Sequence, residues 1–114
     1  MYNLYIETKV PSVNHYWLAN GHKRYISSKG REFKRMLSIE AKRIGCSAID
    51  GDIKIVINWY KKGKRRGDLD NILKVIMDSL NGIGYHDDSQ VKIIIAHMHE
   101  NYGVDAVDIS LFKI

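Results

Sequence analysis

Hydrophobic and polar side chains alternate along several short stretches of the chain. In residues 53–60, isoleucines and a tryptophan occupy every second position, a pattern that predicts a half-buried β-strand. Leu4 and Ile6 also alternate with polar neighbours and predict a strand at residues 2–8, and further strands are predicted at residues 23–27, 91–98 and 104–112. Residues 100–103, Glu-Asn-Tyr-Gly, lie between the last two strands and are typical of a hairpin connection.

Two other stretches repeat their hydrophobic residues at spacings of three and four, which predicts amphipathic helices. The first has a strongly basic outer face, stops at Gly45, and has as its apolar positions Phe33, Met36, Leu37, Ala41 and Ile44. The second spans residues 68–80, with a stripe of Leu69, Ile72, Leu73, Ile76 and Leu80. The predicted order is β(β)-α-β-α-β-β, a mixed α/β (α+β) fold with two helices packed on a mixed β-sheet.

The size and composition favour one soluble domain. The chain has 114 residues, 45% of them hydrophobic and 27% charged, so residues 1–114 are expected to form a single domain. No stretch approaches the roughly 20 apolar residues of a membrane span, and the N-terminus lacks the apolar core of a signal peptide. The single cysteine, Cys46, excludes an internal disulfide. We therefore expect a cytoplasmic protein.

Charge is distributed unevenly along the chain. Residues 1–66 hold fifteen basic and five acidic side chains, a net of +10, whereas residues 67–114 hold three basic and eight acidic ones, a net of −5. A basic region suits a polyanion, because neutralised phosphates release counterions. The acidic region would repel the same polyanion unless a divalent cation joined them.

A group of aspartates in the acidic region suggests how such a cation is held. Asp68 stands at the expected N-cap of the second helix, Asp70 lies in its first turn, and Lys74 is four residues further along the same face. Asp87 and Asp88 follow a short loop, which we expect to return them to the same end of the sheet. Mg²⁺ prefers hard oxygen ligands, and a neighbouring lysine can neutralise charge that develops on a phosphate.

The same residues also have an ordinary structural interpretation. Aspartates are common helix caps, Asp70 and Lys74 form a normal i,i+4 pair, and Asp87-Asp88 is a normal turn sequence. For Asp78, one turn beyond Lys74, we expect a structural or solvated role.

At these residues the sequence resembles the RusA-like family of Holliday junction resolvases. The matching pieces are GDLDN at residues 67–71, Lys74, DSLNG at residues 78–82 and DDSQV at residues 87–91. PSVNHYW at residues 11–17 resembles the family's entry segment. The resemblance covers most of the chain in order and length.

The resemblance implies a structure-selective endodeoxyribonuclease of DNA recombination and repair, which resolves four-way junctions by paired nicks. The family's catalytic and metal-binding aspartates fall on Asp68, Asp70 and Asp88, and its important lysine falls on Lys74. Asp87 is a second-rank metal ligand. The implied cofactor is Mg²⁺, with Mn²⁺ as a substitute, and the implied assembly is a homodimer that binds branched DNA in a bacterial or phage-infected cell.

The sequence also suggests which residues contact the DNA backbone. The KKGKRR loop directly precedes the aspartates, and the family's entry segment supplies an asparagine, so the candidate contacts are Lys61, Lys62, Lys64, Arg65, Arg66 and Asn14. A non-catalytic basic DNA-binding module is the main alternative function. A small ribonuclease is the third, although nothing in the sequence recognisably reads a 2′-hydroxyl.

Overall fold

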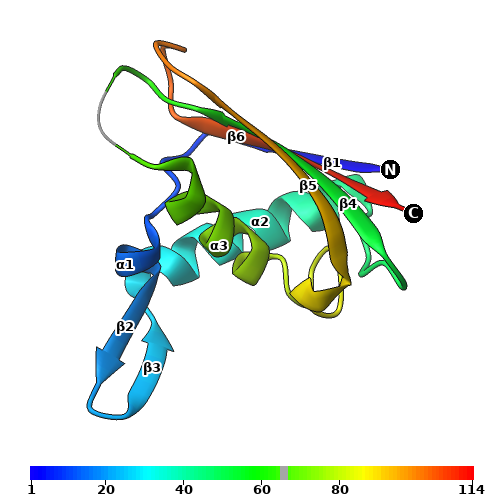
Figure 1. The fold of residues 1–114 in the computed structure, drawn as a ribbon, viewed down its shortest axis with the longest axis horizontal. Coiled ribbons are helices and arrows are strands. Elements are labelled where there is room, and N and C mark those ends of the chain that lie inside the picture. Colours follow the sequence, from blue (N-terminus) through cyan, green and yellow to red (C-terminus); the bar gives the residue numbers. More distant parts are fainter. Residues whose placement is uncertain (65–66) are drawn as a thin grey trace.

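The structure is a computed structural model that describes residues 1–64 and 67–114. The strands are β1 (Tyr2–Ile6), β2 (Trp17–Asn20), β3 (Lys23–Ile26), β4 (Ile53–Tyr60), β5 (Val91–His99) and β6 (Ala106–Lys113). The helices are α1 (Val13–Tyr16), α2 (Ser28–Ile44), α3 (Leu69–Ser79) and a 3₁₀ turn, η1 (Asp88–Gln90). Four strands form one sheet in the order β1-β6-β4-β5, and β2 and β3 form a separate hairpin (Figure 1).

The main sheet is mixed, as the sequence predicts. β6 is antiparallel to both β1 and β4, whereas β5 is parallel to β4. The helix α3 makes the crossover between the two parallel strands, and it therefore runs in the opposite direction to them. The order of strands and long helices predicted from the hydrophobic pattern is confirmed.

The predicted hairpin between β5 and β6 is wrong, because β4 lies between these two strands. The turn residues instead dock on the loop that follows β4, where the Tyr102 amide donates to the Lys61 carbonyl at 2.9 Å. Asn101 and Gly103 adopt positive φ angles of 56° and 97° there. Residues 100–103 do form a turn, but the connection that they close crosses the end of β4 and is wider than a hairpin.

The core lies between one face of the sheet and the two long helices, which cross that face (Figure 1). Alternate residues of β4 point into this core and are at most 5% exposed: Ile53, Ile55, Ile57 and Trp59. Each helix supplies a matching apolar stripe, with Phe33, Leu37 and Ala41 from α2 and Ile72, Val75 and Ile76 from α3. The sheet therefore fixes the position of α3.

The β2–β3 hairpin projects from the body of the molecule as an arm (Figure 1). Its base is tightly packed, because a side chain at Gly30 would come within 2.7 Å of the Tyr16 ring. Ser27 accepts a hydrogen bond from the Gly30 amide at 3.0 Å and so begins α2 directly after the arm. The sequence pattern indicates β3, but not its partner β2.

None of the helices in the described ranges is long and apolar enough to cross a membrane.

Candidate active site

Asp68 occupies the N-cap position of α3 without acting as a cap. Its backbone is extended (φ −92°, ψ 138°), but its side chain accepts no cap hydrogen bond, and the carboxylate is exposed. The preceding Gly67 packs so closely on Trp59 that a Cβ atom there would lie 2.9 Å from the indole ring. The end of β4 thus fixes where Asp68 lies and leaves its oxygens available to a ligand.

A charged stripe runs along α3 from this point. Asp70, Lys74 and Asp78 are spaced by four residues and share one face, which spans about 12 Å at 1.5 Å per residue. The Lys74 ammonium lies 3.0 Å from Asp78 Oδ1, and the Trp17 indole N–H donates to Asp78 Oδ2 at 2.9 Å. Asp78 is therefore held from both sides, by its own helix and by the first residue of β2.

Asp88 joins this stripe at the C-terminal end of α3. The loop that carries it is anchored by Tyr85, whose hydroxyl donates to the Met77 carbonyl at 2.6 Å, and by Gln90, whose amide group donates to the Ile49 and Gly51 carbonyls. The charges of Lys74 and Asp78 both act on Asp88.

The two adjacent aspartates of this loop have different environments. Burial raises the pKa of Asp88, the charge of Asp87 raises it further, and Lys74 opposes them. A side-chain hydrogen bond with Asp78 and the charge of Asp78 also raise the pKa of Asp88. Asp87 instead accepts hydrogen bonds from the Ser89 side chain and from the Ser89 amide, the latter at 3.0 Å, and these lower its pKa. Asp87 is thus a cap for η1, whereas Asp88 faces the charged stripe of α3.

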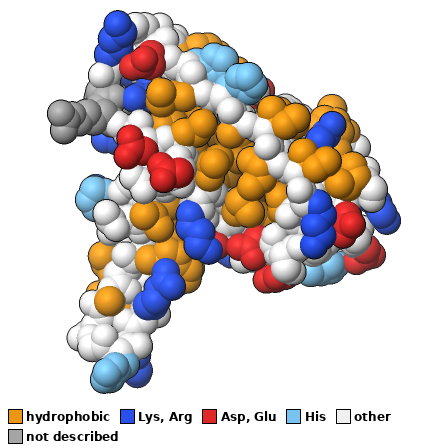
Figure 2. Space-filling model, viewed as in Figure 1, with side chains coloured by type: hydrophobic (Ala, Val, Ile, Leu, Met, Phe, Trp, Pro, Cys, Tyr) orange, Lys and Arg blue, Asp and Glu red, His pale blue; other side chains and the backbone are white. Residues whose placement is uncertain are grey.

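The expectation that all the aspartates meet at one end of the sheet is wrong. Asp68 follows the end of β4, and Asp88 precedes the start of the parallel strand β5, so α3 separates them by its full length. Figure 2 shows acidic side chains in separate groups on this face, with basic and hydrophobic side chains between them. Among the described residues of one chain, no three acidic, histidine or cysteine side chains are close enough to share a metal ion.

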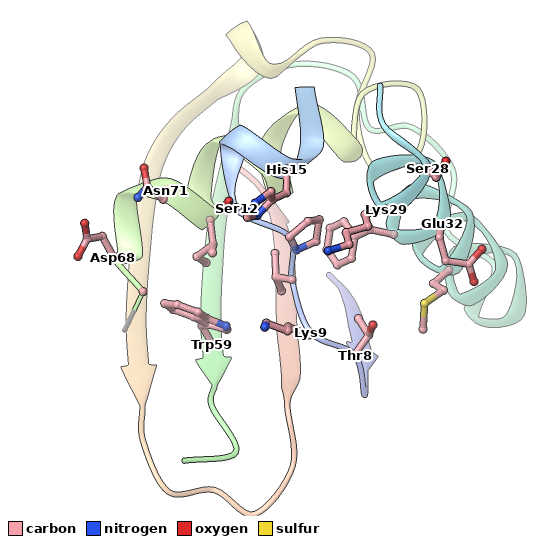
Figure 3. Close-up of a pocket in the computed structure, with 16 residues that line it drawn as sticks. Thr8, Lys9, Ser12, His15, Ser28, Lys29, Glu32, Trp59, Asp68 and Asn71 are labelled. Carbon is pink, nitrogen blue, oxygen red and sulfur yellow. Dashed lines mark hydrogen bonds between the residues drawn. The ribbon is translucent and has the colours of Figure 1, made fainter. Parts of the chain in front are cut away.

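Asp68 lies on the rim of a cavity of about 620 Å³ (Figure 3). The cavity lies between the N-terminal ends of α2 and α3, with Asp68 and Asn71 at one end and Lys29 and Glu32 at the other. Its walls are mostly apolar and include Val10, Pro11, Phe33, Met36, Trp59 and Ile72. A second hollow beside Asp68 is lined by Lys61, Lys64, Met98 and Glu100, among others.

The predicted DNA contacts differ in their placement. Lys62 and Lys64 are exposed in the loop after β4, and Asn14 is exposed on α1. Lys61 is only 2% exposed, and its ammonium lies 5.3 Å from the centre of the Trp59 ring. Lys61 is therefore buried in the packed end of β4, whereas a DNA contact is expected to be exposed. Arg65 and Arg66 lie outside the described residues.

Asp78 and Trp17 form a contact at the site that sequence reasoning did not find. Asp78 is expected from the sequence to be structural or solvated, and its side chain is 10% exposed and contacts both Lys74 and Trp17. The spacing of four residues between Lys74 and Asp78 was the sequence signal that could have indicated their contact. Nothing in the local sequence indicates that Trp17, 61 positions away, would donate to it.

Comparisons with known proteins identify the family of this chain. The family model "Endodeoxyribonuclease RusA" matches residues 8–111. This chain belongs to the RusA endodeoxyribonuclease family. A relative from Enterobacteria phage HK97, described as a crossover junction endodeoxyribonuclease RusA, is 32% identical over 81 residues, which is 70% of this chain and 68% of the relative.

Proposed function

We propose that this protein is a Mg²⁺-dependent endonuclease that resolves four-way (Holliday) DNA junctions by paired nicks, and that it acts as a homodimer. The family assignment supports nuclease chemistry, and the name of the phage relative supports a crossover junction as substrate. The observation that carries the proposal is the division of the carboxylates between the two ends of α3, beside a strand edge that can pair with a second copy.

The donor groups of this chain fit Mg²⁺. Asp68, Asp70 and Asp88 offer hard carboxylate oxygens, and Asp68 is not used as a helix cap. Asp87 is second in rank because its carboxylate accepts the Ser89 amide. Mn²⁺ has the same preference for oxygen and is expected to substitute. A bound divalent ion supplies the charge that lowers the pKa of water and stabilises phosphate oxygens during hydrolysis.

The remaining polar residues would hold the substrate. The Lys74 side chain is 57% exposed and lies between the two carboxylate groups, where its ammonium can stabilise negative charge on the phosphate that is attacked. Lys64 lines the hollow beside Asp68, Lys62 is exposed in the same loop, and both would contact backbone phosphates. Lys23 and Arg24 are exposed on the projecting arm and would contact a neighbouring DNA arm.

The edge strand β5 supports a dimer. It pairs with β4 on one side only, and its other edge is not covered by a strand of the described chain. Four of its large apolar side chains are 40–43% exposed: Ile93, Ile94, Ile95 and Met98. A long apolar edge of this kind is a template for pairing with another strand.

A second copy of β5, paired antiparallel, would complete the site. A two-fold axis through the middle of the strand places the start of one β5 beside the end of the other. The two α3 helices would then lie side by side in opposite directions on the same face of one continuous sheet. Asp88 of each protomer would consequently approach the partner's Asp68 and Asp70.

The charges at the two ends of β5 are complementary in this arrangement. Lys92 lies near the start of the strand and Glu100 directly follows its end. Antiparallel pairing brings the lysine of one copy towards the partner's glutamate, twice per dimer. A four-way junction also has approximate two-fold symmetry, so the two sites would meet opposing strands.

A cleavage assay tests the proposed function. End-labelled four-way junctions and matched linear duplexes are incubated with the protein, with Mg²⁺ or with EDTA, beside an Asp70→Asn variant. We expect symmetric paired nicks on the junction alone, only with Mg²⁺, and none with the variant, which should still bind. Tight binding of the junction by the unmodified protein without nicks would overturn the proposal in favour of a binding module.

A further inference from the structure

Asp78 is a restrained charged side chain near the site. Its side chain is 10% exposed, and its two oxygens have different donors: Lys74 Nζ at 3.0 Å and the Trp17 indole N–H at 2.9 Å. Trp17 is itself fixed, because its ring packs edge-on against the fully buried Tyr16 at a centroid distance of 5.5 Å.

This arrangement differs from an ordinary surface ion pair. An exposed i,i+4 pair contributes little, because both long side chains lose entropy when they meet. Here the carboxylate is already held by a side chain from outside the helix, so only Lys74 remains to be ordered. The pair therefore restricts the Lys74 ammonium to the Asp88 end of the site, where its charge acts on that carboxylate.

The contacts of Asp78 also argue against a direct role as a metal ligand. Both of its carboxylate oxygens accept hydrogen bonds from protein donors. A cation at Asp78 would have to share its oxygens with the lysine and the indole, whereas Asp68 has no such competing cap bond.

We infer that Asp78 and Trp17 are positioning residues that hold the Lys74 ammonium in place for phosphodiester cleavage, an inference that rests on the proposed function. Trp17 fixes the carboxylate of Asp78, and Asp78 fixes Lys74. Because Trp17 is also the first residue of β2, this hydrogen bond joins the arm to the C-terminal part of α3. Displacement of a reacting group by about 1 Å can slow catalysis by up to about a hundredfold.

The test measures single-turnover junction cleavage at saturating protein for Asp78→Asn, Trp17→Phe, Lys74→Met and the Asp78→Asn/Lys74→Met double variant. We expect Asp78→Asn to slow cleavage about tenfold and Trp17→Phe about threefold, each with unchanged junction affinity. The double variant should be no slower than Lys74→Met alone, because Asp78 acts only through Lys74. The Mg²⁺ concentration for half-maximal rate should stay the same in Asp78→Asn.

A second readout reports on the positioning contacts without DNA or metal. The NMR resonance of the Trp17 indole N–H should shift in Asp78→Ala, which removes its acceptor, and should remain in place in Glu40→Gln. Glu40 is a matched control, because it is an 18% exposed helix carboxylate paired with Arg43 at 2.6 Å, far from the site in sequence and on another helix.

The outcomes separate this inference from the proposed function. Normal cleavage by Asp78→Asn, a further loss in the double variant, or a large rise in the Mg²⁺ requirement of Asp78→Asn would each overturn the positioning role. An unmodified protein that does not cleave junctions would overturn the proposed function. Circular dichroism on each variant identifies a rate loss that is due to unfolding, and Trp17→Phe, which keeps the ring packing, serves if Asp78→Asn does not fold.

Discussion

Asp68 and Asp87 precede helical turns in the same way, but only Asp87 uses its carboxylate as a cap. We therefore expect Asp87→Ala to lower the midpoint of thermal unfolding by about 3 °C, and Asp68→Ala to change it by less than about 1 °C. Thermal unfolding followed by circular dichroism measures both. Equal losses would mean that Asp68 is a structural cap and would weaken its assignment as a metal ligand.

The residue types at the site could be predicted from the sequence, but their contacts could not. The spacing of Asp70, Lys74 and Asp78 places them on one helix face, and the structure keeps them there. The hydrogen bond from Trp17 to Asp78 depends on how the arm packs against α3, which no local pattern encodes. The burial of Lys61 was not predicted for a related reason. A lysine within a basic run gives no local sign that its side chain is buried against Trp59.

At the scale of elements, the lysines in the loop after β4 differ in how exposed they are. Lys64 is exposed beside Asp68, whereas Lys61 is buried under Met98 and Trp59. We expect Lys64→Ala to weaken junction binding and to reduce the slope of log affinity against log salt by about 1, because one phosphate contact is lost. Lys61→Met should leave that slope unchanged. Titrations at several salt concentrations measure it, and an equal effect of both substitutions would contradict this division.

The strand β4 and the two long helices were predictable because their hydrophobic residues recur with a period of two or about 3.6 residues, whereas β2 was not indicated by the sequence pattern. The arrangement of the elements in space was less predictable. β5 and β6 are neighbours in the sequence, and an Asn-Tyr-Gly turn joins them, yet β4 lies between them in the sheet. A parallel β4–α3–β5 unit also carries the chain along the whole of α3, so Asp88 returns to the end of the sheet opposite Asp68. Long-range strand pairing therefore sets both the position of β4 between β5 and β6 and the separation of Asp88 from Asp68.

At the scale of the whole molecule, the proposed dimer depends on the free edge of β5. A lysine in place of Ile95, which is 42% exposed at the middle of this edge, would put two like charges close to the two-fold axis. We expect Ile95→Lys to be monomeric and to lose junction cleavage. Ile39→Lys, which changes a 52% exposed isoleucine on α2, is the matched control and should behave like the unmodified protein. Sedimentation measures the oligomeric state, and an intact Ile95→Lys dimer would exclude this interface.

The same dimer predicts that two inactive variants restore one another. If each site combines Asp70 of one protomer with the partner's Asp88, a heterodimer of Asp70→Asn and Asp88→Asn has one site with both substitutions and one with neither. Co-expressed in equal amounts with different tags, the variants should recover about a quarter of the active sites, because half of the dimers are heterodimers with one intact site each. Their product should be a junction nicked on a single strand, since the second site is inactive. Sites built within one protomer would give no recovery, because each site of the heterodimer would then lack one carboxylate.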